Sequence, residues 1–176
     1  MTTLAVGVLG LGLGRHHVGW YAGSDAIRRL VLCDPNEERV RATREAFPQV
    51  AAAYPSLEEM LTHEHLDAIS VTTPDHLHRP HAVQCLEAGC HVLLAKPIAT
   101  TIGDARAIIA AEEAGSARLM LAHERRYRVS TLAIKEHLAQ GTLGQVIHLT
   151  IDSIQDKREQ FRRAPWYAAP EAGRSA

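Results

Sequence analysis

The chain has 176 residues, of which 46% are hydrophobic and 22% are charged, and its formal net charge is −1. This composition is typical of a globular protein with one well-buried domain and room for part of a second. A charge balance so close to zero gives no reason to expect nucleic acid or an anionic membrane as a partner. No apolar run approaches the length of a membrane span, and the N-terminal residues lack the pattern of a signal peptide.

Three cysteines, Cys33, Cys85 and Cys90, form no C-x-x-C pair. A sparse and odd number of cysteines is typical of buried thiols in a reducing compartment. The sequence therefore predicts a cytoplasmic protein whose cysteines are buried as thiols.

The first apolar run leads directly into a cluster of glycines. Residues 4–9 are apolar without alternation, as in a strand that is covered on both faces, and residues 16–22 are compatible with a helix. The turn between them has the sequence Gly10-Leu11-Gly12-Leu13-Gly14. Glycines leave bare backbone for a ligand, and a helix start offers free N–H groups, so this order of elements favours a pyrophosphate.

The spacing of these glycines differs from the usual G-x-G-x-x-G pattern of dinucleotide-binding turns. Gly10 and Gly12 match the pattern, whereas Gly14 comes one residue early and Arg15 stands in the third glycine position. We expect this turn to bind a dinucleotide, and an ordinary strand-to-helix turn without a ligand is the alternative.

The residues up to 122 alternate strands with helices. Further buried strands are expected at residues 30–33, 50–53, 67–72, 91–94 and 117–122. Helices are expected at residues 37–46 after Asn36, at 58–61 after Ser56, from Pro80 to Gly89, and from Thr101 to Gly115 with Ala105, Ile108 and Ile109 on its buried face. This alternation predicts an α/β fold with a doubly wound parallel sheet, which binds ligands beyond the carboxyl ends of its strands.

The pattern changes after residue 122. Residues 130–139 are compatible with a helix, and residues 146–154 alternate in polarity like a half-buried antiparallel strand with no partner in the chain. The tail over residues 156–176 is expected to be irregular. We therefore expect a dinucleotide-binding domain over residues 1–124 and the start of an incomplete second α/β domain over residues 125–176.

A carboxylate follows the second strand. Asp34 lies about twenty residues past the glycine turn, where a carboxylate can accept both hydroxyls of an adenosine ribose. Because it would repel a 2′-phosphate, NAD is favoured over NADP as the cofactor. The alternative is a turn residue before Pro35.

Polar residues also follow the fourth strand. Thr73, Pro74 and His78 are expected to face the ribose or the nicotinamide of the cofactor. His76, His78 and His81 also lie close together in sequence, but they surround a turn and no acidic or thiolate ligand recurs beside them. No metal site is therefore expected.

Lys96 and Pro97 follow the fifth strand. A lysine at this edge can donate a hydrogen bond to a substrate oxygen or pass a proton during hydride transfer, although most lysines are simply solvated at the surface. Pro97 is a candidate for a cis peptide bond that fixes the direction of the lysine.

Taken together, these motifs resemble the Gfo/Idh/MocA oxidoreductases. The matching segments are residues 8–12, Cys33-Asp34, Thr73-Pro74 with His78, residues 88–93, Lys96-Pro97 and residues 123–127. The resemblance implies a Rossmann domain that binds NAD(P), and a second domain that carries the substrate and usually the oligomer interface. It also implies hydride transfer between nicotinamide and a small-molecule substrate, a sugar or polyol, with Lys96 as the acid/base.

The chain departs from the family pattern in three places. Ala95 replaces the glutamate of an E-K-P motif, the glycine turn is one residue short, and the D-x-x-x-H pair of the second domain has no match. We therefore expect a truncated gene, a chain that pairs with another chain such as a homo-oligomer through its unpaired strand, or a protein that only binds the cofactor. A non-catalytic NAD-binding or regulatory module of the same fold is the alternative function.

Overall fold

The computed structural model describes residues 3–152, 154–156, 158 and 162. The described residues belong to two compact units, one up to Ala122 and the other from His123 onward. This division lies two residues before the expected boundary after residue 124.

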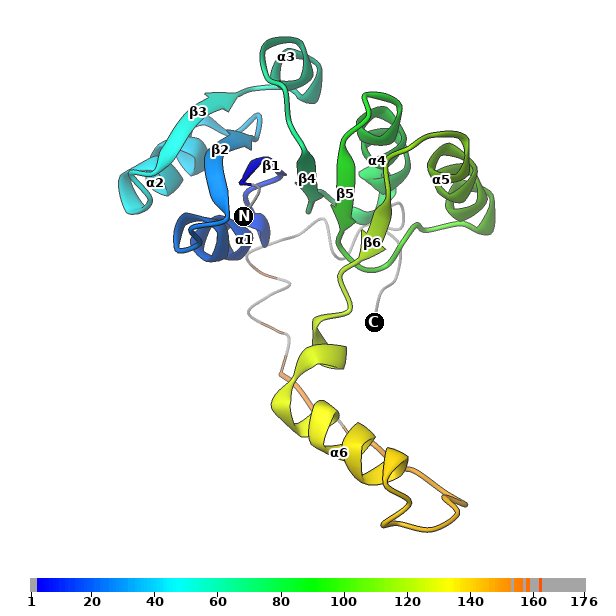
Figure 1. Cartoon of the computed structure of the whole chain (residues 1–176). Helices are drawn as coiled ribbons and strands as arrows, with labels where there is room; N and C mark the ends of the chain where they lie inside the picture. Colours follow the sequence, from blue (N-terminus) through cyan, green and yellow to red (C-terminus); the bar gives the residue numbers. More distant parts are fainter. Residues whose placement is uncertain (1–2, 153, 157, 159–161, 163–176) are drawn as a thin grey trace. The chain divides into compact units, whose positions relative to one another are not determined.

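The first unit is built on a sheet of six strands in the order β3-β2-β1-β4-β5-β6 (Figure 1). The strands are β1 (Leu4–Leu9), β2 (Ile27–Cys33), β3 (Val50–Tyr54), β4 (Ala68–Val71), β5 (His91–Leu94) and β6 (Leu119–Leu121), and all neighbouring pairs are parallel. The order reverses between β1 and β4, which is the point where doubly wound sheets bind dinucleotides. The predicted fold class is confirmed.

Helices connect the strands of the first unit. They are α1 (Gly14–Ala22), α2 (Glu37–Ala46), α3 (Leu57–His63), α4 (His78–Glu87) and α5 (Ile102–Ala114), with the short 3-10 turn η1 (Asp75–Leu77) before α4. The side chains of Asn36, Ser56 and Thr101 each accept a hydrogen bond from a backbone N–H in the first turn of their helix. These caps confirm the predicted helix starts, and each contributes about 1 kcal/mol.

Two predictions about the helices are wrong in detail. Helix α4 begins at His78 and not at Pro80, because a proline within the first turn loses no hydrogen bond and the helix can start before it. In α5, Ile108 is fully buried, whereas Ile109 is 47% exposed. One residue along a helix turns the side chain by roughly 100°, which carries Ile109 off the buried face.

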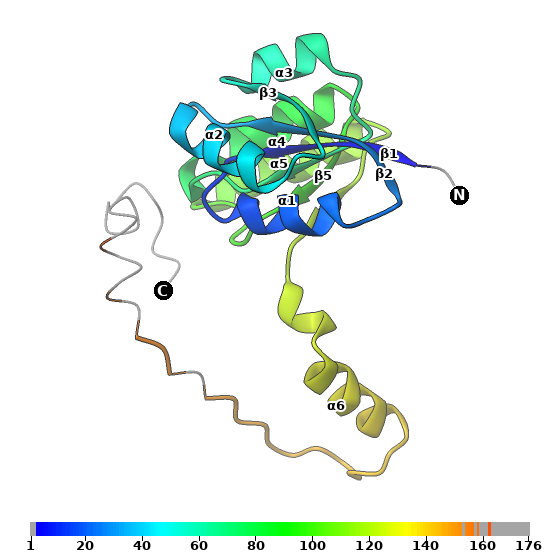
Figure 2. The same cartoon turned by 90° about the vertical axis from the view of Figure 1, so that its left-hand side faces the viewer.

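Hydrophobic clusters cover both faces of the sheet. Val8 and Leu32 pack with Val18 of α1 and Val40 of α2 on one face. On the other face, neighbouring strand residues such as Leu9 pack against α3, α4 and α5, and Figure 2 shows α1 and α3 on opposite sides of the strands. Because both faces of the sheet are covered, consecutive residues of a strand are apolar, as the sequence indicated.

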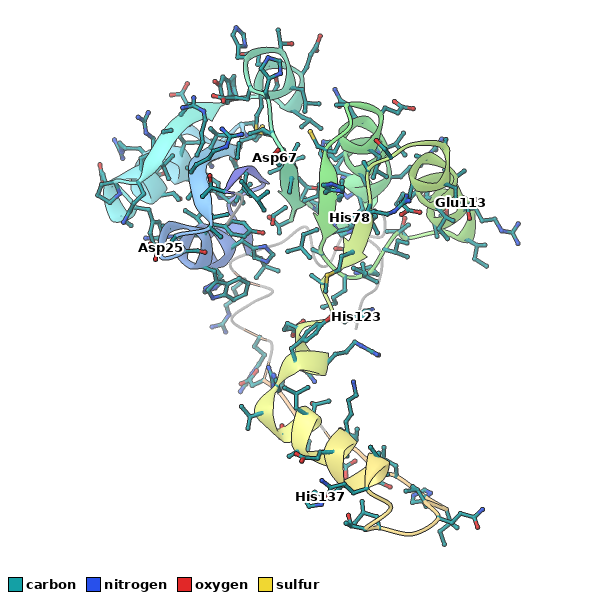
Figure 3. The ribbon with its side chains drawn as sticks, viewed as in Figure 1. Asp25, Asp67, His78, Glu113, His123 and His137 are labelled. Carbon is teal, nitrogen blue, oxygen red and sulfur yellow. The ribbon has the colours of Figure 1, made fainter. Side chains whose placement is uncertain are left out.

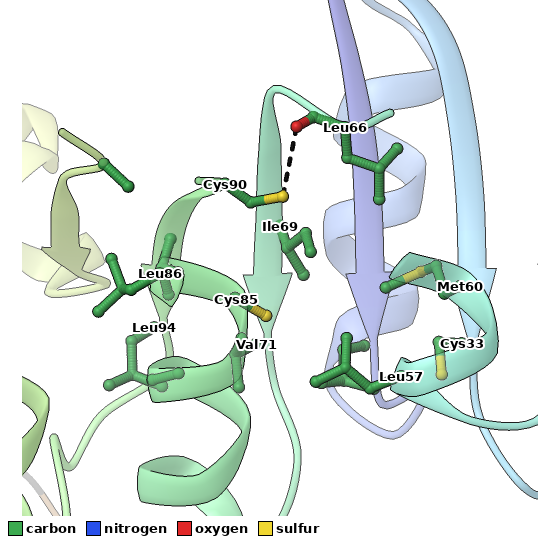
Figure 4. Packing of buried hydrophobic residues seen from close by; sticks show 14 of the residues in the cluster. Cys33, Leu57, Met60, Leu66, Ile69, Val71, Cys85, Leu86, Cys90 and Leu94 are labelled. Atoms are coloured by element: carbon green, nitrogen blue, oxygen red, sulfur yellow. Dashed lines mark hydrogen bonds between the residues drawn. The ribbon is translucent and has the colours of Figure 1, made fainter. Parts of the chain in front are cut away.

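All three cysteines lie in the cluster that α3, α4 and α5 cover (Figure 4). They are free and buried, and the Cys90 Sγ donates a hydrogen bond to the Leu66 carbonyl oxygen at 3.3 Å. Burial raises the pKa of Cys33 to about 12 and raises the pKa of Cys85 as well. The predicted buried thiols are confirmed.

The second unit contains the short 3-10 turn η2 (Glu124–Tyr127) and the helix α6 (Val129–Ala139), which confirms the helix predicted over residues 130–139. The strand predicted over residues 146–154 is wrong for its described residues, which form no strand and expose Ile147 and Ile151. An alternating pattern is local, whereas a strand needs hydrogen bonds to a neighbouring strand. The oligomer contact through this segment stays a prediction, and most of the tail from residue 156 lies outside the described residues.

No helix among the residues that the structure describes is long and apolar enough to cross a membrane.

Candidate functional site

The carboxyl ends of four strands meet at one edge of the sheet. Their last residues stand level with one another in the strand pairing: Leu9, Cys33, Val71 and Leu94. The backbone continues this pairing one step further, because Gly10 N–H donates to the Cys33 carbonyl and Ala95 N–H donates to the Val71 carbonyl, at 2.8 and 2.9 Å. Every predicted site residue follows one of these four ends, so the structure brings them to a common edge.

Gly10 makes the turn possible. Its φ of +89° lies in the left-handed region, which favours glycine. A Cβ at this position would also lie 2.9 Å from the backbone oxygen of Thr72. Both the conformation and the close approach therefore require glycine at Gly10.

Gly14 allows α1 to pack closely against the sheet. It is the first residue of α1, and a Cβ there would collide with Thr72 Oγ1 and would lie 2.9 Å from Val8 Cγ1. The third glycine of a dinucleotide-binding turn has this same task of close helix–strand packing. Gly14 performs it although it comes one residue early, so the short spacing is compatible with a dinucleotide site.

Gly12 and the start of α1 leave an open backbone surface. A Cβ at Gly12 would have no other atom within 4 Å. Leu13, at the N-cap of α1, makes no side-chain capping bond, and the first turn of α1 has no acidic residue. Helices α2, α3 and α5 have side-chain caps. In α1, the N–H of His16 donates to the Leu13 carbonyl oxygen at 3.0 Å. The N–H groups of Gly14 and Arg15 before it can serve another acceptor, and this arrangement fits a pyrophosphate.

Asp34 links the glycine turn to the end of β2. Its carboxylate is 5% exposed, and Oδ2 accepts from Leu11 N–H at 2.6 Å while Oδ1 accepts from Asn36 N–H at 2.8 Å. A carboxylate oxygen has two acceptor positions, so this bonding leaves capacity for ribose hydroxyls. The guanidinium of Arg39 lies 3.9 Å from Oδ2, and no pattern in the sequence predicted this positive charge beside Asp34.

Thr72 joins the glycine turn to β4. Its hydroxyl donates to the carbonyl oxygens of Leu9 and Gly10 at 3.0 and 2.7 Å, and its N–H donates to Leu9 as well. This side chain occupies the space that Gly14 leaves open. The strand expected at residues 67–72 included Thr72, whereas β4 ends at Val71 and Thr72 is the first residue after it.

Two histidines hold Thr73. Its Oγ1 lies 3.0 Å from His81 Nδ1, and its carbonyl oxygen lies 3.0 Å from His78 Nε2. Burial lowers the pKa of His81, and the neighbouring His78 and His76 lower it further. Pro74 is half-buried and stands at the N-cap of η1.

Both ring nitrogens of His78 have backbone partners within the protein. His78, which is labelled in Figure 3, is fully buried, and its second ring nitrogen, Nδ1, lies 2.7 Å from the Pro97 carbonyl oxygen. Both ring nitrogens therefore face the backbone of the protein itself. A contact between His78 and the cofactor stays a prediction, and it would not involve the buried ring.

Lys96 is exposed directly after β5. The Lys96–Pro97 peptide bond, a candidate for the cis form from its sequence, is cis. Lys96 thus stands at the same edge as the glycine turn and Asp34.

No group of three or more His, Cys, Asp or Glu side chains among the described residues is arranged to hold a metal ion. Both ring nitrogens of His78 and the Nδ1 of His81 face Thr73 or Pro97 instead.

Comparisons with known sequences identify the family. The profile of the Gfo/Idh/MocA oxidoreductase family, NAD-binding Rossmann fold, matches residues 4–123. The inositol 2-dehydrogenase 1 of Saccharopolyspora erythraea is 34% identical over 148 residues, which are 82% of this chain and 44% of that protein. The D-apiose dehydrogenase of Paraburkholderia graminis is 31% identical over 138 residues, 78% of this chain and 36% of that protein.

Solved structures agree with this fold. The myo-inositol 2-dehydrogenase of Lactobacillus plantarum has a TM-score of 0.85 at 21% identity and covers 98% of this chain and 52% of its own. The WlbA dehydrogenase of Bordetella pertussis, in complex with NADH and UDP-GlcNAcA, has a TM-score of 0.74 at 28% identity and covers 81% and 44%. The chain spans about half the length of these relatives or less. The chain belongs to the Gfo/Idh/MocA family of oxidoreductases, and residues 4–123 are its Rossmann fold.

Proposed function

We propose that this chain binds NAD at the edge formed by Gly12, Asp34 and Lys96, as the cofactor-binding part of an oxidoreductase that acts on a sugar or polyol alcohol. The observation that carries the proposal is the open space at Gly12 beside the uncapped start of α1. Bare backbone and free N–H groups are what a pyrophosphate needs. The names of two relatives, an inositol dehydrogenase and a D-apiose dehydrogenase, support the substrate class.

The carboxylate of Asp34 supports NAD over NADP. Its spare acceptor positions suit the two hydroxyls of a ribose, whereas a 2′-phosphate would meet the same negative charge at short range. Relatives of both kinds exist, because WlbA was solved with NADH and the scyllo-inositol 2-dehydrogenase IolW of Bacillus subtilis is named for NADP(+). A direct comparison of the two coenzymes is therefore part of the tests below.

Lys96 is the residue that we expect to handle the proton. A nicotinamide ring supplies the position that accepts or donates the hydride. The ammonium of Lys96 donates a hydrogen bond to the substrate oxygen and stabilises negative charge on that oxygen. It also carries the proton that lysine and substrate oxygen exchange. Because Ala95 carries no carboxylate, Lys96 acts without an acidic neighbour at that position.

We also propose a reducing compartment such as the cytoplasm, since the three cysteines are free and buried. We further propose that residues 125–176 belong to a substrate domain.

A matched pair of glycine variants tests the proposal. Gly12→Ala adds a methyl group into open space, so the protein should fold normally but bind NADH about tenfold more weakly or worse. Gly103→Ala is the control, because it adds the same methyl group in the first turn of α5, where the nearest atom lies 3.8 Å away. Fluorescence titration with NADH measures affinity, and thermal unfolding measures folding. An unmodified chain that fails to bind NADH, or equal affinity in Gly12→Ala, contradicts the proposal.

A non-catalytic NAD-binding or regulatory module is the second candidate, and Ala95 in place of the family glutamate favours it. Incubation of the chain with NAD and a panel of inositols, hexoses and aminosugars separates the two candidates. Sustained reduction of NAD excludes the binding-only module, whereas binding without reduction by any sugar of the panel supports it.

A further inference from the structure

The first turn of α4 touches two loops at the proposed cofactor edge. His78 lies between the carbonyl oxygen of Thr73, after β4, and that of Pro97, after β5, at 3.0 and 2.7 Å. Thr73 and Pro97 follow neighbouring strands, since Val71 of β4 pairs with Leu94 of β5. One buried ring thus spans the gap between the two loops.

Both partners of the ring are carbonyl oxygens, which only accept hydrogen bonds. The ring therefore donates through a nitrogen that carries a proton, and each of its two nitrogens lies at hydrogen-bond distance from one loop. The geometry places this one side chain against both loops at once.

The two loops carry the groups that the proposed function uses. Thr72, beside Thr73, holds the glycine turn through its bonds to Leu9 and Gly10. Lys96 directly precedes Pro97. The bonds of His78 therefore connect the backbone that would bind the pyrophosphate to the backbone that carries the acid/base.

We propose that His78 is a positioning residue, whose buried ring sets the place of Lys96 relative to the bound coenzyme. This inference rests on the proposed function. His81, one turn further along α4, holds the hydroxyl of Thr73 and supports the same loop. A side chain that only filled space would need the shape of the ring and neither of its nitrogen contacts.

Replacing His78 should affect the two halves of the coenzyme differently. In His78→Gln, an amide N–H group keeps one of the two bonds, and the loop after β5 loses its tie. NADH affinity should fall about tenfold, whereas ADP, which lacks the nicotinamide half, should lose less than about twofold. His76→Gln is the matched control, because His76 is an exposed histidine two residues earlier and its loss should change neither affinity. Equal losses for NADH and ADP would mean a general structural role and would overturn the proposal, and so would no loss for either.

NMR of the unmodified chain, without coenzyme, tests the ring itself. A ring N–H of His78, assigned through its own backbone signals, should be protected from exchange with solvent, and rapid exchange overturns the inference even if every variant fails to fold. The amide signal of Lys96 should shift in His78→Gln and stay in place in His76→Gln, and an unmoved signal in both also overturns the inference. If the unmodified chain binds neither NADH nor ADP, the proposed function fails, and these spectra still decide whether His78 ties the two loops.

Discussion

Two buried carboxylates of the first unit have opposite surroundings. Glu64, after α3, accepts three hydrogen bonds from side chains, two from the guanidinium of Arg29 and one from the hydroxyl of Tyr54, each at 2.6 Å. Asp34 accepts one backbone N–H on each oxygen, and the guanidinium of Arg39 lies 3.9 Å away. Glu64 therefore stabilises the fold, whereas Asp34 can accept further hydrogen bonds at the edge where the strands end.

Burial alone does not separate these two residues, because Glu64 is 8% exposed and Asp34 is 5% exposed. What separates them is the kind of partner. The guanidinium and hydroxyl donors use three of the four acceptor positions of Glu64 and bring a positive charge to it. The two backbone donors fix the direction of the Asp34 carboxylate and leave two of its positions. A buried acid held by the backbone at a strand end is thus a better candidate for ligand binding than one held by an arginine.

The largest expected effect comes from breaking the Glu64 site. Glu64→Gln removes the charge that Arg29 pairs with, and we expect the free energy of unfolding to fall by about 2 kcal/mol. The loss stays below that of a fully buried pair because the side chain of Arg29 is 41% exposed and can be hydrated again. Urea unfolding measures the change. NADH affinity should not change, and a parallel loss of binding would contradict the division between the two carboxylates.

The matched change at the other site is Asp34→Asn. The amide oxygen can still accept one of the two backbone N–H groups, so the free energy of unfolding should fall by less than about 1 kcal/mol. NADH affinity should fall about tenfold, because a charged acceptor for the ribose hydroxyls is lost. Titration with NADPH is the control, and its affinity should fall less than that of NADH or rise. A similar loss for both coenzymes would remove the argument for NAD.

The stability of the protein at acid pH tests the comparison between Glu64 and Asp34 further. The hydrogen bonds from Arg29 hold the pKa of Glu64 below its usual value of 4.5, with a smaller contribution from Tyr54. A carboxyl whose pKa is lowered by folding stabilises the protein above its unfolded pKa and loses this contribution as the pH falls through its folded pKa. As the pH falls below about 4.5, the unmodified chain should therefore lose more stability than Glu64→Gln, which has no carboxyl group to protonate at this position. Urea unfolding at several pH values checks this, and parallel acid profiles would contradict it.

The site's location could be predicted because its signals are local or follow from a general rule of sheet geometry. The apolar runs before Gly10, Asp34 and Lys96 identify buried strands, and parallel strands end at a common edge. Caps such as Asn36 mark helix starts because their bonds reach only three residues along the chain. Each of these inferences needs no knowledge of distant partners.

The remaining features depend on partners that the sequence order does not reveal. The role of His78 follows from where the loop after β5 lies, nineteen residues away in the chain. The alternating segment near Ile147 has the polarity of a strand, but its pairing would be set by a neighbouring strand. The pairing of Arg39 with Asp34 could not be predicted, because an arginine in an exposed helical turn looks like any solvated residue until its distance to the carboxylate is known.

The smallest expected effect concerns Arg39, and it tests how far Asp34 acts alone. The guanidinium is 54% exposed and 3.9 Å from Oδ2, so solvent screens most of its interaction with the carboxylate. In Arg39→Ala, NADH affinity should change by less than about threefold. NADPH affinity should fall more, because the cation next to Asp34 is the group that offsets its repulsion of a 2′-phosphate. Arg106→Ala, which removes an equal charge from α5, is the control. If Arg106→Ala weakens NADPH binding as much as Arg39→Ala does, the net charge of the chain decides the preference between NADH and NADPH. If only Arg39→Ala weakens NADPH binding, and less so at high salt, the pair of Asp34 and Arg39 decides it.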